Sequence, residues 1–136
     1  MAKVGTFINY KDNAAAVAAV GTAYASAKRI TLKMLNSSDA RSVSGYFDRL
    51  YVYVSSISSA ASLSMKITND TDGDDVIVPE IPGKVIETGI TTATEGAVVF
   101  DLGHQVWSDA DDTVYVWLKC NNGTVTVDTT RLIWSE

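Results

Sequence analysis

The chain has 136 residues and a formal net charge of -5, with 46% hydrophobic and 20% charged residues. This length and composition fit one globular domain, and the acidic balance argues against nucleic-acid binding because phosphates would be repelled. Cys120 is the only cysteine, which excludes an intrachain disulfide, and the longest apolar run, residues 14–20, is too short to span a membrane.

The first 28 residues differ in character from the rest of the chain. Residues 1–12, MAKVGTFINYKD, lack the charged and then apolar layout of a signal peptide, so we expect synthesis and folding in a cytoplasm. Residues 14–20 are rich in alanine, which favours a short helix broken by Gly21. The alternative is an arm of small residues that lies flat against a neighbour. We therefore divide the chain into an N-terminal arm or short helical segment, 1–28, and a β-sandwich domain, 29–136.

Three segments then alternate as strands do, two of them with apolar and polar side chains and the middle one with aliphatic residues and tyrosines, so that both of its faces are apolar. They are residues 30–34, 46–55 and 63–68. Their predicted inward side chains are Ile30, Leu32, Met34, Leu50, Val52, Val54, Leu63, Met65 and Ile67.

The second half of the chain continues with short strands between turn residues. A strand over 76–78 should end at Pro79 and Pro82, which cannot donate to a central ladder and so indicate a sheet edge. Strands are also predicted over 84–88, 96–102 and 132–134, with the loop GITTATE after the first and a ten-residue loop after the second. About eight short strands without a long helix predict an all-β fold, an antiparallel β-sandwich of jelly-roll type.

Residues 113–128, TVYVWLKCNNGTVTVD, have the strongest hairpin signal of the chain. Asn122-Gly123 favours a type I′ turn, which connects two adjacent antiparallel strands. The turn would set Cys120 opposite Val125 and Trp117 opposite Asp128, with small apolar partners sharing one face.

The acidic turn at residues 70–75 is the stronger of two candidate metal sites. Asp70, Asp72 and Asp74 have the spacing of the first calcium ligands in an EF-hand, but Gly73 comes two positions early and Ile81 stands where the bidentate Glu belongs. A solvated turn is therefore favoured, with calcium as the alternative. A second acidic group, Asp109, Asp111 and Asp112, should lie at the opposite end of the sandwich if successive strands alternate in direction.

No enzymatic or cofactor-binding pattern is present in the sequence. His104 is the only histidine, and although Ser108 and several aspartates lie near it, they form no ordered triad and no nucleophile elbow. Cys120 shares its predicted face with Val116 and Leu118, which indicates a buried thiol. We expect a protein without catalytic residues.

Four aromatic residues are predicted on outward positions of two strands. If Leu50 and Val116 point inward, then Tyr51, Tyr53, Tyr115 and Trp117 point outward and could form one patch. Such a patch would contact a partner protein or stack on sugars. The alternative is that other segments of the same chain cover these rings.

The order of these features resembles the small β-sandwich proteins of tailed-phage virions, especially those of marine and cyanobacterial phages. The resemblance is carried by LYVYVSS, SLSMKITNDTDGDDVIVPE, GITTATEGAVVF and DTVYVWLKCNNGTVTVDTTRLIWSE, within residues 46–136. It implies a non-enzymatic assembly role on a capsid, tail or fibre. Residues 1–28 have no counterpart in it.

The leading hypothesis is a capsid decoration or cement subunit in the virion, assembled in the host cytoplasm. Its expected partners are a major capsid protein or another virion protein and further copies of the chain, with no nucleic acid and no membrane. The alternative is a carbohydrate-binding or receptor-binding module of a tail or adhesin, with the four aromatic residues stacking on sugar rings. We expect removal of residues 2–28 to abolish particle binding while the sandwich stays folded.

Overall fold

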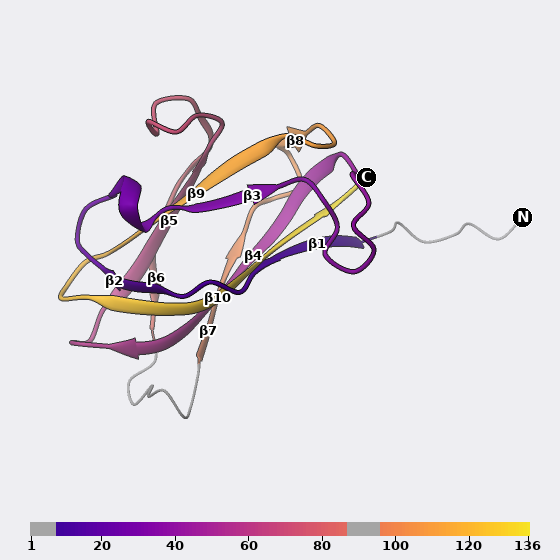
Figure 1. Cartoon of the computed structure of the whole chain (residues 1–136). Coiled ribbons are helices and arrows are strands. Elements are labelled where there is room, and N and C mark those ends of the chain that lie inside the picture. Colours follow the sequence, from indigo (N-terminus) through magenta and orange to yellow (C-terminus); the bar gives the residue numbers. More distant parts are fainter. Residues whose placement is uncertain (1–7, 87–95) are drawn as a thin grey trace, which may run out of the picture.

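The computed structural model describes residues 8–86 and 96–136, which form two antiparallel sheets packed face to face (Figure 1). The larger sheet has the order β1 (Ile8–Asn13), β10 (Val125–Ser135), β4 (Gly45–Ile57), β7 (Gly96–Asp101), with short strands β2 (Val17–Val20) on β10 and β8 (Trp107–Ser108) on β4. The smaller sheet has the order β3 (Ile30–Lys33), β9 (Thr113–Cys120), β5 (Ser62–Thr68), β6 (Val76–Val85). The 3-10 turn η1 (Ser26–Lys28) precedes β3, and no helix among the described residues is long and apolar enough to cross a membrane.

The strand pairs are nested in sequence, as in a long hairpin rolled into a barrel-like sandwich. β1 pairs with β10, β3 with β9, β4 with β7 and β5 with β6, so the outermost strands pair together and the innermost pair together. Pairing of β10 with β4 joins the two halves of the larger sheet, and pairing of β9 with β5 joins those of the smaller sheet. The predicted all-β antiparallel jelly-roll sandwich is confirmed, with ten strands in place of about eight because β2 and β8 supplement the roll.

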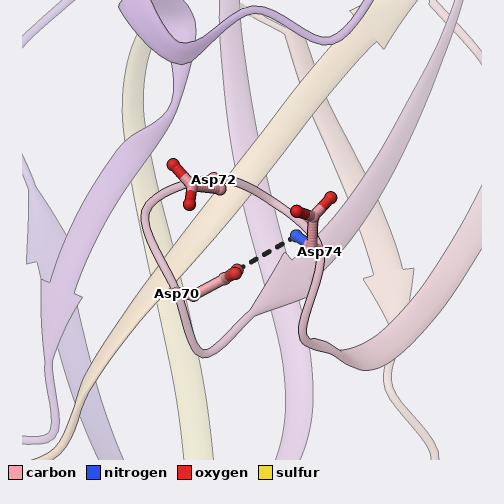
Figure 2. A group of neighbouring side chains, drawn as sticks. All are labelled: Asp70, Asp72 and Asp74. Carbon is pink, nitrogen blue, oxygen red and sulfur yellow. Dashed lines mark hydrogen bonds between the residues drawn. The ribbon is translucent and has the colours of Figure 1, made fainter.

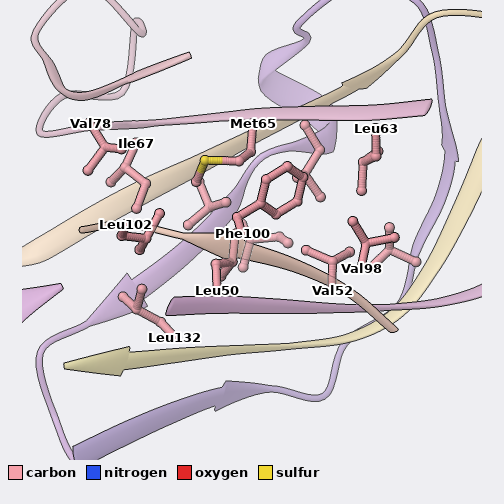
Figure 3. Packing of buried hydrophobic residues seen from close by; sticks show 14 of the residues in the cluster. Leu50, Val52, Leu63, Met65, Ile67, Val78, Val98, Phe100, Leu102 and Leu132 are labelled. Atoms are coloured by element: carbon pink, nitrogen blue, oxygen red, sulfur yellow. The ribbon is translucent and has the colours of Figure 1, made fainter. Parts of the chain in front are cut away.

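Side chains from both sheets meet in one core between the layers. Leu50 and Phe100 of the larger sheet face Met65 and Ile67 of the smaller sheet, and all four are fully buried (Figure 3). The nine inward residues predicted from alternation are all buried, which confirms the faces of these strands.

The prolines lie at a sheet edge, as predicted, but they do not end the strand. β6 is the edge strand of the smaller sheet and runs from Val76 through Pro79 and Pro82 to Val85. Its pairing with β5 shifts register three times, which lets both prolines be accommodated without ending the ladder. The separate strands predicted over 76–78 and 84–88 are therefore one strand, and residues 87–88 and the loop GITTATE lie outside the described residues.

The hairpin predicted at Asn122-Gly123 is wrong. β9 belongs to the smaller sheet and β10 to the larger, so the turn carries the chain from one layer to the other (Figure 1). Cys120 pairs with Leu63, and Val125 pairs with Ile57. Only Gly123 of the two turn residues has positive φ, whereas a type I′ turn needs both. The Asn-Gly signal marked a real turn, but long-range pairing decides the strand partners.

The helix predicted over residues 14–20 is also wrong, because residues 17–20 form β2, which pairs with the sandwich, and residues 14–16 are irregular. β1 runs along β10 from Thr130 to Ser135, and β2 joins the same edge of β10 at Val125 and Val127. Val20 is completely buried. The preference of alanine for a helix is weak, and a helix of seven residues is marginal, so pairing with an open strand edge prevails. The boundary at residue 28 does not set these strands apart from the larger sheet.

Candidate functional site

The four aromatic residues predicted to form one patch lie on opposite sides of the molecule. Tyr51 and Tyr53 are on β4 in the larger sheet, whereas Tyr115 and Trp117 are on β9 in the smaller sheet. Each pair alternates with core residues and therefore points away from the core of its own sheet. The predicted single platform does not form, because its two strands belong to different layers.

The outer face of the smaller sheet is covered by side chains of the same chain. Trp117 is only 5% exposed, and its Nε1 donates to Thr68 Oγ1 at 2.8 Å. The guanidinium carbon of Arg29 lies 5.2 Å from the Tyr115 ring centre and 5.6 Å from that of Trp117. Gly73 in the acidic turn lies close over the Trp117 ring. Tyr115 and Trp117 therefore follow the alternative prediction, in which other segments of the same chain cover the aromatic rings.

The same covering layer continues through Tyr24. Lys66 and Lys119 place their ammonium groups 4.9 and 4.8 Å from the centre of its ring, and its hydroxyl donates to Glu80 Oε1 at 2.6 Å. Burial, followed by this bond to Glu80, raises the pKa of Tyr24. The hydrogen bonds from Tyr24 and Lys119 lower the pKa of Glu80. Through Tyr24, the segment between β2 and η1 is thus held against β5, β6 and β9.

The outer face of the larger sheet presents a continuous row of side chains across four strands. The register places Asp12, Arg131, Tyr51 and Val99 side by side on β1, β10, β4 and β7. Tyr51 and Tyr53 stack with ring centres 6.4 Å apart, and Val99 is 38% exposed. This face combines aromatic and apolar groups on β4 and β7 with charged groups on β1 and β10, and among residues 8–86 and 96–136 it has no covering layer like that of the smaller sheet.

At the β8 end of the same face, the structure brings together residues that sequence reasoning had not grouped. His104 Nδ1 contacts Asp48 Oδ1, and Asp48 Oδ2 accepts a 2.6 Å hydrogen bond from Ser135 Oγ. The ring of Tyr46 lies between His104 and Trp107, at centre distances of 5.0 and 4.9 Å. Trp107 is 46% exposed. We call Tyr46, Asp48, His104, Trp107 and Ser135 the His104 cluster.

Two local features position this cluster. Asp48 is the extra residue of a β-bulge, because Ile133 pairs with Arg49 and Trp134 pairs with Phe47. Gly103 and His104 have φ of 78° and 54°, so both have the sign of φ that a type I′ turn requires. The Gly-His pair was the available sequence signal for a tight turn, but the 56 residues between Asp48 and His104 concealed their contact.

The His104 cluster contains Ser, His and Asp but lacks the arrangement of a hydrolytic triad. A triad needs the aspartate at one imidazole nitrogen and the serine at the other, so that the ring can move a proton between them. Here Ser135 Oγ lies 3.3 Å from Nδ1, the nitrogen that already faces Asp48. The serine therefore supports the carboxylate and is not aligned for attack.

The three carboxylates of the acidic turn lie close together, as a metal site would require. One oxygen from each of Asp70, Asp72 and Asp74 lies within 4.8 Å of the others (Figure 2). Asp70 Oδ1, however, accepts hydrogen bonds from the backbone N–H groups of Gly73, Asp74 and Asp75 at 3.0–3.2 Å. Lys66 Nζ also donates to the Gly73 carbonyl at 3.0 Å. Asp70 thus organises the turn, and the calcium alternative stays a prediction.

The second acidic group lies at the same end of the smaller sheet as the acidic turn, contrary to the prediction. Thr68 at the end of β5 pairs with Tyr115 near the start of β9, so the segments beyond them extend from one end. Asp111 accepts a hydrogen bond from Ser42 and lies 3.2 Å from Lys33 Nζ, and these contacts lower its pKa. The prediction failed because it counted residues 76–78 and 84–88 as two strands, whereas both belong to β6, so the chain reverses direction one time fewer between the two acidic groups.

Cys120 is buried, as predicted. Its Sγ lies 3.4–3.5 Å from the carbonyl oxygens of Val20, Gly21, Asn122 and Gly123. The thiol packs between β2 and the turn after β9, away from the His104 cluster.

Comparison with known proteins finds distant solved structures, among them a galactanase and a subviral particle. No family model and no curated protein matches the sequence. The exo-beta-1,3-galactanase from Phanerochaete chrysosporium is 8% identical with a TM-score of 0.46, over 96% of this chain and 30% of that chain. The VP2 subviral particle of infectious bursal disease virus is 10% identical with a TM-score of 0.33, over 96% of this chain and 41% of that chain. The chain spans less than half of either, and similarity at this level carries no functional argument.

Proposed function

We propose that the chain is a non-enzymatic structural protein of a tailed-phage virion, a capsid decoration or cement subunit that attaches through the outer face of its larger sheet. The observation that carries this proposal is the difference between the two outer faces. Within the part of the chain that the structure describes, Tyr24, Arg29 and Lys66 cover the smaller sheet, whereas no such layer lies over Tyr51 and Val99 on the larger sheet.

The composition of this face suits a protein contact. Aromatic residues and arginine are the residue types enriched where proteins associate. Arg131 lies 4.3 Å from the centre of the Tyr10 ring and is held by Asp12, so its side chain is already ordered before any partner binds. An ordered surface loses less conformational entropy on binding.

The small size and rigid fold of the chain are also compatible with a decoration subunit. A repeated lattice rewards a rigid small fold that makes many modest contacts, since avidity multiplies them. The partners we propose are a major capsid protein or other virion protein and further copies of this chain. The resemblance of residues 46–136 to virion proteins supports the location.

The alternative, a carbohydrate-binding or receptor-binding module, was inferred from a single patch of four aromatic residues, and this patch does not form. Tyr51 and Tyr53 cannot act with Tyr115 and Trp117 on one ligand, because the core separates the two pairs. A sugar site would need other residues.

The test begins with particles purified on a density gradient from the phage that encodes the chain. Mass spectrometry should find hundreds of copies per particle for a head lattice component. A few to tens of copies would move the chain to a tail or fibre, and its absence from particles would refute the virion assignment.

The attachment face is tested by adding purified chain to particles that lack it. Val99→Glu and Tyr51→Glu should abolish binding, because each puts a charge into the contact. Thr31→Glu is the matched control, since Thr31 is exposed on β3 in the smaller sheet. Retained binding by both variants on the larger sheet would refute this face as the contact.

A further inference from the structure

We propose that the surface beside the His104 cluster is a binding site for a neutral saccharide. A shallow depression of about 670 Å³ opens there, lined by Asp48, Arg49, Val99, Asp101, Gly103 and His104. The depression shares Val99 with the proposed attachment face, and its lining residues differ from the four aromatic residues of the sequence prediction.

The depression offers both hydrogen-bond donors and acceptors. Arg49 has five N–H donors, of which one contacts Tyr51 Oη at 3.3 Å. Asp101 uses Oδ1 to accept from the Gly103 N–H at 2.9 Å. Within residues 8–86 and 96–136, Asp101 Oδ2 and His104 Nε2 have no hydrogen-bond partner. Planar polar groups of these kinds match the paired hydroxyls of a sugar ring.

The charges of the lining favour a neutral ligand. One guanidinium faces two carboxylates, those of Asp48 and Asp101, so the depression has no excess of positive charge. A phosphate, sulfate or carboxylate ligand would meet these carboxylates unfavourably. A ligand rich in hydroxyl groups satisfies the donors and acceptors together.

An aromatic wall adjoins the polar depression. Tyr46 contacts the His104 ring, and Trp107 meets Tyr46 edge to face with an interplanar angle of 72°. Trp107 Nε1 donates to Asp109 Oδ1 at 2.9 Å, which fixes the orientation of the exposed indole. Exposed, oriented aromatic rings stack on the apolar C–H face of a sugar.

The turn that contains His104 has a conformation that keeps the imidazole ring at the edge of the depression. His104 adopts φ of 54°, a left-handed conformation that is unfavourable for a residue with a Cβ. Its backbone N–H donates to the Phe47 carbonyl at 2.9 Å, and Asp48 holds Nδ1. These contacts leave Nε2 on the outer side of the ring, and such strained turns often occur at functional sites.

The experiment uses the full chain on an array of neutral hexose and N-acetylhexosamine oligosaccharides of two to six units, followed by titration of the best binder. Trp107 is the accessible tryptophan, because Trp117 is 5% exposed and Trp134 is buried. A bound sugar should therefore protect the fluorescence from acrylamide quenching. Trp107→Ala and Arg49→Ala should each weaken binding about tenfold or more, as expected for loss of one stacking or charge-assisted contact.

Matched variants separate the site from the fold. Thr31→Ala on the opposite face should bind as the unmodified chain does, and all variants should unfold at similar temperatures because the substituted side chains are exposed. Absence of binding to every oligosaccharide at millimolar concentration would overturn the proposal. Preference for sulfated or sialylated glycans, or binding unaffected by Trp107→Ala and Arg49→Ala, would also overturn it.

Discussion

Asp12 and Arg131 form a two-pronged ion pair that ties β1 to β10, with Nε to Oδ1 at 2.6 Å and Nη2 to Oδ2 at 2.9 Å. The two residues are directly opposite in the strand register, although 119 positions separate them in sequence. Both side chains are about 40% exposed, at 41% and 39%, so solvent weakens the pair, but its geometry fixes the register of β1. The N-terminal segment is thus built into the larger sheet.

This pairing leads to a prediction about truncation. Removal of residues 2–20 deletes β1 and β2, uncovers the edge of β10 and takes Val20 out of the core. The free energy of unfolding should fall by about 3 kcal/mol or more, measured by urea denaturation. A chain that lacks only residues 2–7 keeps both strands and is the control. Unchanged stability after the longer deletion would restore the expectation that the sandwich stays folded without the first 28 residues.

Gly45 marks a place where β4 comes too close to β10 for any side chain. A Cβ there would lie 2.7 Å from the Ser135 carbonyl oxygen and 2.8 Å from Trp134 Cδ1. Gly45→Ala should therefore lower the free energy of unfolding by about 1–3 kcal/mol, because the backbone of β10 must shift. Gly21→Ala is the matched control, since no heavy atom lies within 4 Å of its added methyl group. Equal urea midpoints for the two variants would contradict this reading of the contact.

The sequence predicts the faces of the strands well because burial with a period of two is a local property. Leu50, Val52 and Val54 alternate with Tyr51 and Tyr53 in sequence, and the same alternation appears in their burial. Partner choice is not local. Asn122-Gly123 indicates a turn correctly, but the nested pairing of the roll puts β9 and β10 in different sheets. The predicted aromatic patch failed for the same reason.

The His104 cluster shows the corresponding limit for functional sites. Its members come from β4, β8, β10 and the turn after β7, so no short window of sequence contains them together. Asp48 also occupies a bulge, which no alternation pattern can place. The acidic turn was predictable because its three carboxylates lie within five residues.

Trp117 should act on stability and not on ligand binding. Its ring is covered by Arg29 and the acidic turn, and its Nε1 donates to Thr68. Trp117→Ala should lower the free energy of unfolding by about 3–5 kcal/mol in urea denaturation. Trp117→Phe should lose less, because it keeps most of the packing and loses the hydrogen bond. An alanine variant of unchanged stability would show that the indole is not part of the packed surface.

Asp70 should stabilise the acidic turn through its backbone hydrogen bonds. Asp70→Ala removes the acceptor shared by the N–H groups of Gly73, Asp74 and Asp75. We expect a loss of about 1–2 kcal/mol in urea denaturation, comparable to the loss of a helix cap. Asp72→Ala is the control, because Asp72 is exposed and its loss leaves these bonds intact.

The same turn gives a test of the calcium alternative. Lys66 donates to the Gly73 carbonyl and places positive charge beside the carboxylates, so added calcium should not raise the melting temperature. A calcium-dependent rise that disappears in Asp72→Asn and Asp74→Asn would establish the metal site and contradict this expectation.

The contact between Tyr24 and Glu80 predicts how stability depends on pH. Burial and the bond to Glu80 raise the pKa of Tyr24. The contribution of Tyr24 to folding stability is therefore complete below the pKa of the unfolded chain, about 10, and is lost as the pH rises through the pKa of the folded chain. Hydrogen bonds from Tyr24 and Lys119 lower the pKa of Glu80, so its contribution is complete above about 4.5 and is lost as the pH falls through the folded value. The contacts of Tyr24, Glu80 and Lys119 should therefore stabilise the fold fully between about pH 4.5 and about pH 10.

Urea denaturation of Glu80→Gln and Tyr24→Phe at pH 3, 7 and 10.5 measures both effects. At pH 7 each variant should be less stable than the unmodified chain, by about 1 kcal/mol or less for Glu80→Gln because its carboxylate is 41% exposed. The deficit of Glu80→Gln should shrink as the pH falls toward 3, because protonation of the folded carboxylate weakens its bonds with Tyr24 and Lys119. The deficit of Tyr24→Phe should shrink at pH 10.5, where ionisation of Tyr24 favours the unfolded chain. Deficits that stay constant across this range would show that the two groups do not interact as their geometry indicates.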